Sequence, residues 1–138
     1  MSKMTSEERE QYLADVPVGV IAGQRPCRAP LARPTWDGRQ PGGEVLLWTE
    51  SGSVKHKAIS EAGRFSITAQ DENPPYKYVT AEGDVTGIGP ADVAEVRDIA
   101  VRYLGADAGA QFAGENFTET SIVIRMRPLR WLSTDYSK

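Results

Sequence analysis

The chain has 138 residues, of which 40% are hydrophobic and 25% charged, and this is an ordinary size for one domain with one core. Its net charge of -3, from 16 basic and 19 acidic residues, gives no electrostatic reason to expect a nucleic acid or an anionic membrane as partner. A single cysteine and a single histidine exclude an internal disulfide framework and a structural zinc site. We expect a single domain over residues 1–138, with no metal.

The N-terminal segment contains features of a helix rather than of a targeting signal. Four acidic side chains lie within Met1–Asp15, where a secretory signal peptide needs an apolar stretch. No apolar segment of the chain approaches the roughly 20 residues that a membrane helix needs. We therefore expect a cytoplasmic protein. Thr5 and Glu8 have the spacing of a capping box, which predicts a short amphipathic helix over Thr5–Ala14.

Three strands are predicted next. Val16–Ala22 is rich in β-branched residues. Pro30–Trp36 contains two prolines, which confine it to an edge, a bulge or a bent strand, because neither proline can donate a ladder hydrogen bond. A turn rich in glycine and proline, Asp37–Gly43, leads into an apolar strand, Glu44–Thr49. The three strands are expected to form an antiparallel meander.

A small-residue turn and a helix follow directly after Thr49. Ser53 is a suitable N-cap, Lys55 and Lys57 lie just beyond it, and Gly63 ends the apolar face of the helix. Free backbone N–H groups and the positive end of the helix dipole favour an anion at such a turn. This predicts a phosphate site; the alternative is that the two lysines belong to an ordinary solvated helix face.

The second half of the chain continues the pattern of strands with short helices. Alternating apolar residues predict a half-buried strand over Arg64–Asp71, and strand character returns over Tyr76–Ile88, where Gly83 marks a bulge. Pro90 is expected at the first position of a helix that ends near Gly105. A shorter helix is predicted over residues 107–113, then a last strand over residues 119–126, broken by the proline at 128.

Six predicted strand segments with peripheral short helices indicate a mainly β, α+β domain. An antiparallel barrel that closes on itself is favoured, because closure removes exposed strand edges in a small domain.

The order of these motifs resembles the split β-barrel flavoproteins related to pyridoxamine 5'-phosphate oxidase, in particular the small actinobacterial flavin/deazaflavin oxidoreductases. The resemblance covers nearly the whole chain through six segments: TSEEREQYLA, PLARPTW, PGGEVLLWTESGSVKHKAI, AGRFSITAQDENPPYKYVTAEGDVT, RYLG and RPLRWLS. It implies a six-stranded antiparallel split barrel that forms a homodimer, with a cofactor in each of two clefts between the protomers.

The resemblance also implies roles for individual residues. Those facing the cofactor phosphate would be Ser51, Ser53, Lys55 and Lys57; Thr49 would contact the ribityl chain, and Pro34, Thr35 and Trp36 would run along the tricyclic ring. The second protomer would contribute Gln70, Tyr76 and Trp131.

Other residues depart from the family or are assigned elsewhere. Asp37 and Arg39 are expected to make the substrate side of the cleft polar, and Val54 removes one possible phosphate contact. Trp48 is expected in the barrel wall, and His56 as an exposed, solvated side chain.

The leading functional hypothesis is an oxidoreductase that uses FMN or the deazaflavin coenzyme F-420 for hydride transfer to or from a small organic substrate. No catalytic side chain is assigned, because the cofactor carries the chemistry and the protein positions it. One alternative is a protein that binds or carries flavin, haem or a related tetrapyrrole without turnover. Another is a structural dimer with a degenerate cleft.

Overall fold

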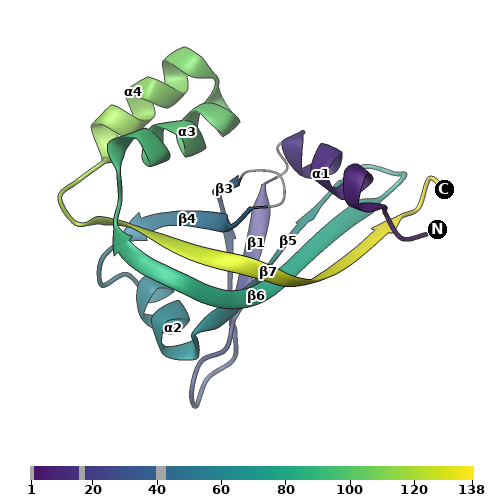
Figure 1. Cartoon of the computed structure of the whole chain (residues 1–138), viewed down its shortest axis with the longest axis horizontal. Coiled ribbons are helices and arrows are strands. Elements are labelled where there is room, and N and C mark those ends of the chain that lie inside the picture. The colour runs from purple at the N-terminus through teal and green to yellow at the C-terminus, as the bar shows by residue number, and fades with distance from the viewer. Residues whose placement is uncertain (1, 16–17, 40–42) are drawn as a thin grey trace.

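The computed structural model describes residues 2–15, 18–39 and 43–138. Over these residues one antiparallel sheet of seven strands is curved around the core, with helices at its ends and side (Figure 1). The strands are β1 Gly19–Gly23, β2 Leu31–Thr35, β3 Asp37–Arg39, β4 Val45–Glu50, β5 Arg64–Gln70, β6 Lys77–Pro90 and β7 Ser121–Asp135. The helices are α1 Ser6–Ala14, α2 Val54–Ala62, α3 Val93–Leu104 and α4 Ala106–Asn116. The mainly β, α+β class is confirmed.

The sheet curls so strongly that its two edge strands are neighbours in the sequence. The strand order is β2-β1-β5-β6-β7-β4-β3, so β2 and β3 are the edge strands, and Trp36 alone separates them in the sequence. β2 pairs with β1, and β3 pairs with β4. The predicted meander of the first three strands is therefore wrong, because β4 pairs with β3 and β7 rather than with β2. The edge position predicted from the two prolines is confirmed.

The strand missing from the prediction is β3. Asp37–Arg39 has the composition of a turn, yet it pairs with Val45–Leu47. Gly38 serves close packing here, since an added Cβ would lie 2.8 Å from Cγ1 of Ile99 on α3. Two parts of the earlier predictions, Val16–Pro17 of the first strand and residues 40–42 of the turn, lie outside the described residues.

The two longest strands, β6 and β7, pair along almost their whole length, and the pairing is interrupted by a bulge near Gly83. Glu82 pairs with Arg130 while Gly83 pairs with Pro128, so β7 has one extra residue here. An added Cβ on Gly83 would lie 1.9 Å from the carbonyl oxygen of Arg127, which explains the glycine. The bulge predicted at Gly83 is confirmed. The predicted end of the strand at Pro128 is wrong, because the bulge accommodates the proline and β7 continues to Asp135.

The helix boundaries follow their capping residues. Thr5 and Glu8 form the predicted capping box of α1. Ser53 caps α2, and Gly63 ends it with a φ of 71°. Pro90 does not begin a helix; it ends β6, and Asp92 caps α3 through a hydrogen bond from the Ala94 amide. None of the helices in the described part of the chain is long and apolar enough to span a membrane.

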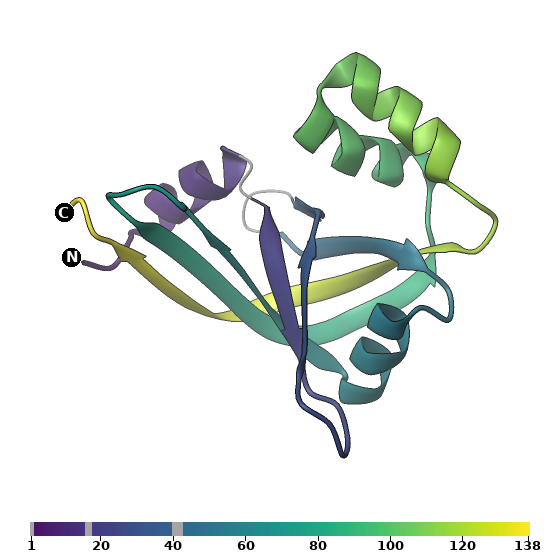
Figure 2. The same ribbon diagram turned by 180° about the vertical axis from the view of Figure 1, so that it is seen from behind.

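Figures 1 and 2 show where the helices lie around the curved sheet. The α3–α4 hairpin lies beyond one end of the barrel, α1 lies near the other end, and α2 lies beside the barrel. The largest core cluster fills the barrel with side chains such as Ile21, Leu47 and Ile124. A separate cluster lies between the helical hairpin and the barrel, where Trp36 and Trp48 pack against it.

Candidate functional site

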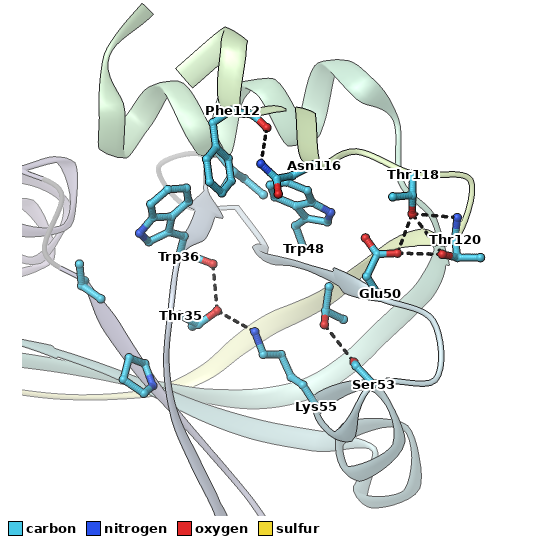
Figure 3. A pocket seen from close by; sticks show the side chains of 14 residues that line it. Thr35, Trp36, Trp48, Glu50, Ser53, Lys55, Phe112, Asn116, Thr118 and Thr120 are labelled. Carbon is cyan, nitrogen blue, oxygen red and sulfur yellow. Dashed lines mark hydrogen bonds between the residues drawn. The ribbon is translucent and has the colours of Figure 1, made fainter. Parts of the chain in front are cut away.

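A cleft of about 830 Å³ lies between the barrel and the α3–α4 hairpin (Figure 3). Its volume falls within the range of small-molecule and cofactor sites, about 300–1,000 Å³. The lining comes from the residue before β1, from β2 and the residue after it, from β4, the start of α2, the helical hairpin and the loop before β7. It consists of Val18, Pro34, Thr35, Trp36, Trp48, Thr49, Glu50, Ser53, Lys55, Ile99, Phe112, Asn116, Thr118 and Thr120.

One part of the cleft, which we call the basic end, consists of Lys55 with the hydroxyl groups of Thr35, Thr49 and Ser53. The Lys55 ammonium Nζ donates to Thr35 Oγ1 at 3.0 Å, and the hydroxyls of Thr49 and Ser53 are 3.0 Å apart. Ser53 also caps α2 by accepting from the His56 amide at 3.2 Å. The basic end thus combines an ammonium group, hydroxyls and the N-terminus of a helix, where anions are favoured.

The charge of Lys55 has no acidic partner nearby. Among the described residues, no carboxylate lies within the 4.0 Å of an ion pair with Lys55. Burial, together with a smaller effect of the nearby positive Arg33, lowers the pKa of Lys55. A bound anion would offset both effects, so the basic end is better suited to an anion than to solvent alone.

The opposite part of the cleft, which we call the aromatic wall, consists of Trp36, Trp48 and Phe112. Ring centroids of Trp36 and Phe112 are 5.1 Å apart, and those of Trp48 and Phe112 are 6.1 Å apart in a nearly perpendicular arrangement. In Figure 3 these rings lie beneath the helical hairpin, while Lys55 and Ser53 lie at the other side of the cleft. The wall offers flat apolar surface of the kind that binds planar ligands.

Trp36 is held in place by a residue of α3, Tyr103. Its ring stacks on Tyr103 at 5.2 Å with an interplanar angle of 6°. The Tyr103 hydroxyl donates to Asp37 Oδ1 at 2.8 Å and accepts from the Asp37 amide at 3.1 Å. Burial raises the pKa of Asp37, an effect that Tyr103 and two nearby arginines oppose. This contact joins the helical hairpin to β3.

The expectation that Asp37 and Arg39 make the cleft polar is wrong. Asp37 is only 6% exposed and faces Tyr103. Arg39 forms a two-point ion pair with Glu10, with N–O distances of 2.9 and 2.8 Å, and its guanidinium lies over the Trp131 ring. Both side chains are buried in internal contacts and neither lines the cleft.

Glu50 is the acidic residue among those that line the cleft. Its Oε2 accepts from the hydroxyls of Thr118 and Thr120 at 2.8 and 2.9 Å (Figure 3). Its Oε1 accepts from the Ser121 hydroxyl at 2.9 Å. Burial alone would raise the pKa of Glu50, but these three hydrogen bonds hold it below its ordinary value. Glu50 is therefore an ionised carboxylate in a fixed position.

The structure brings six of the eleven predicted site residues to the cleft: Pro34, Thr35, Trp36, Thr49, Ser53 and Lys55. Ser51 and Lys57 are exposed and lie outside the lining, as does Val54. Gln70 and Tyr76 are also exposed, and Trp131 lies between the guanidinium groups of Arg9 and Arg39. These last three were assigned to the cleft of a partner protomer, and that assignment stays a prediction.

Several lining residues were not predicted, notably Trp48, Glu50 and Phe112. For the first two a signal was present. Val45 and Leu47 are buried, so the alternation of side chains along β4 places Trp48 and Glu50 on the opposite face of the strand. Phe112 had no such signal, because nothing in the sequence of α4 indicates which part of the barrel the helix covers.

Comparison with solved structures gives 108 matching chains. An F420 reductase superimposes with a TM-score of 0.71 at 21% identity, covering 89% of this chain and 94% of its own. A protein from Listeria innocua described as a candidate pyridoxamine 5'-phosphate oxidase gives a TM-score of 0.70 at 12% identity, covering 93% and 96%. A FAD and heme binding protein from Mycobacterium smegmatis gives 0.68 at 18% identity, covering 98% and 73%.

These likenesses establish the fold and nothing finer, because every identity is below 25%. No sequence model of a protein family matches the chain, and a search of curated proteins gives no match. The fold is thus the split barrel shared by F420 reductase, pyridoxamine 5'-phosphate oxidase-like proteins and FAD and heme binding proteins.

Proposed function

We propose, from the split-barrel fold that this chain shares with F420 reductase and pyridoxamine 5'-phosphate oxidase-like proteins, that it is an oxidoreductase. It uses a flavin-type cofactor, FMN or the deazaflavin coenzyme F-420, for hydride transfer to or from a small organic substrate. The observation that carries the proposal is the presence, in one cleft, of a flat aromatic wall and of a helix N-terminal lysine that forms no ion pair within the described part of the chain.

The residues of the cleft fit a phosphorylated planar cofactor. Lys55, Ser53 and Thr49 would hold the phosphate, since a lysine without an acidic partner, hydroxyls and a helix N-terminus are the groups that bind one. Pro34, Thr35 and Trp36 would lie along the ring. A flavin or deazaflavin bound here supplies the hydride chemistry.

The chain's own contribution is position and exclusion of water. Tyr103 stacks behind Trp36 and fixes its ring, so the surface offered to a planar ligand is already in place. Phe112 on α4 packs against both Trp36 and Trp48 and completes the same aromatic wall. We assign no side-chain nucleophile, since positioning and ring electrostatics are what hydride transfer requires of the protein.

The proposed working form is a homodimer, and the outer face of the sheet supports it. Cross-strand pairs place Pro34, Val20, Thr68, Thr80 and Leu132 in one row across five strands. Val20 and Leu132 are 38% and 57% exposed, and Pro34 also lines the cleft. A second copy packed on this face would cover exposed apolar surface and at the same time narrow the open side of the cleft.

The second candidate is a protein that binds or carries flavin, haem or a related tetrapyrrole. The FAD and heme binding protein with the same fold favours it. Haem iron is usually held by His, Cys, Met or Tyr, and none of these is among the described residues that line the cleft. The single histidine, His56, is half-buried rather than fully exposed as expected, and its Nδ1 accepts from the Gly52 amide at 2.9 Å. A flavin-type ligand is therefore the better fit.

The deciding experiment is a titration of the purified protein with FMN and, separately, with coenzyme F-420. We expect one of them to bind and to quench tryptophan fluorescence, because Trp36 and Trp48 line the cleft. Failure of both to bind would overturn the proposal. Anaerobic reduction of the bound cofactor, followed by a single turnover with candidate acceptors, then separates an oxidoreductase from a carrier: a carrier leaves the reduced cofactor unchanged.

A further inference from the structure

Two fixed charges of opposite sign line the cleft without being paired to each other. Lys55 bonds to Thr35, and Glu50 bonds to the hydroxyls of two loop residues, Thr118 and Thr120, and of Ser121, the first residue of β7. Within the described ranges 2–15, 18–39 and 43–138, no basic side chain lies within 4.0 Å of Glu50. The proposed cofactor phosphate gives Lys55 an anionic partner, whereas the phosphate cannot neutralise Glu50.

The surroundings of Glu50 also favour a positive charge. Trp36, Trp48 and Phe112 form the aromatic wall of the same cleft, and the faces of aromatic rings attract cations. Figure 3 shows Glu50 near Trp48, on the side of the loop that carries Thr118 and Thr120. Three hydroxyl groups already hold both carboxylate oxygens of Glu50 in place. Ligand binding therefore costs little entropy for ordering this side chain.

We propose that the aromatic wall and Glu50 select a cationic organic substrate, with a flat or apolar body and a protonated amine or quaternary ammonium group. The body would lie against Trp48 and Phe112, and the positive group would lie towards Glu50. An anionic substrate would be repelled by the carboxylate. That this ligand is the substrate rests on the proposed function; the preference for positive charge does not.

Three probes of similar size separate charge from shape: benzyltrimethylammonium, benzyl alcohol and benzoate. Each is titrated into the full-length protein with and without FMN, by calorimetry and by following the indole N–H signals of the tryptophans in nuclear magnetic resonance spectra. We expect the cation to bind about tenfold more tightly than the anion, with the alcohol between them. The difference should decrease with added salt, since Glu50 is partly exposed.

The variant Glu50→Gln keeps hydrogen bonds to the loop and removes the charge. The preference for the cation should disappear in it, while benzyl alcohol binds as before. Glu61→Gln is the matched control, because Glu61 is an exposed residue of α2 outside the cleft lining; it should keep the preference. Equal binding of cation and anion by the native protein, or a preference that survives Glu50→Gln, overturns the inference. Either result leaves FMN binding, measured separately on both variants, as the test of the proposed function.

Discussion

Lys55 and Lys57 are two residues apart in the first turn of α2, and the structure gives them different surroundings. Lys55 lines the cleft and bonds to Thr35, whereas Lys57 is exposed and outside the lining. Residues two apart on a helix do not face the same side. Both alternatives drawn from the sequence are therefore present in one turn: an anion-site lysine and a lysine of a solvated face.

Lys55→Ala should weaken FMN or F-420 binding by about 1.5–3 kcal/mol, roughly 10- to 150-fold, because a charge-assisted contact to the phosphate is lost. The free energy of unfolding should change little, since Thr35 keeps a hydrogen bond to the Trp36 carbonyl. The measurement is a fluorescence titration with each cofactor. Lys57→Ala is the control and should bind almost as the native protein does; equal losses in both variants would contradict the assignment of the basic end.

At the scale of elements, the α3–α4 hairpin is the part of the fold that turns a barrel surface into a cleft. The two helices lie very close together, since an added Cβ on Gly109 would lie 2.5 Å from the Val101 Cα. The hairpin is joined to the barrel by the Tyr103–Asp37 hydrogen bonds and by the stacking of Trp36 on Tyr103. The position of Phe112 in the cleft depends on this packing.

Gly109→Ala should therefore destabilise the protein by about 1–3 kcal/mol, because the new methyl group meets backbone atoms that cannot move aside. Urea unfolding followed by circular dichroism measures the effect. Gly114→Ala provides the matched control on the same helix. Nothing lies within 4 Å of its added Cβ, so it should be neutral or stabilise the protein by up to about 1 kcal/mol through helix propensity. Destabilisation of the same size in both variants would show that close packing is not the reason for Gly109.

At the scale of the whole molecule, the proposed homodimer connects the outer sheet face with the cleft. The row from Pro34 through Val20 to Leu132 leaves apolar side chains exposed on a face that also borders the cleft. A charge placed within that row would have to be buried without a partner in a dimer that uses this face.

Val20→Glu should convert the dimer to a monomer and weaken cofactor binding, as measured by sedimentation equilibrium and by titration with FMN or F-420. Val93→Glu is the control, because Val93 is similarly exposed, at 43% against 38% for Val20, but lies on α3. It should remain dimeric. A Val20→Glu variant that stays dimeric would rule out this face as the interface, whatever the cofactor results.

The sequence by itself determined those features that depend on neighbours along the chain. The caps of α1 and α2 and the edge position of the proline-rich strand are local, because a cap or a missing N–H acts within a few residues. The basic end was predictable for the same reason, since Thr49, Ser53 and Lys55 lie within one strand–turn–helix unit. Gly83 also marked the bulge in the sequence, although the Arg127 backbone that it approaches lies far along the chain.

The tertiary structure decided which distant segments meet. Asp37–Arg39 is a strand because β4 and α3 pack against it, although its composition is that of a turn. Phe112 belongs to the cleft because the α3–α4 hairpin covers one end of the barrel, which no local pattern specifies. The sequence assigned the same phosphate-binding role to Lys55 and Lys57. In the structure Lys55 lies on the side of α2 that faces the barrel and bonds to Thr35, whereas Lys57 is exposed.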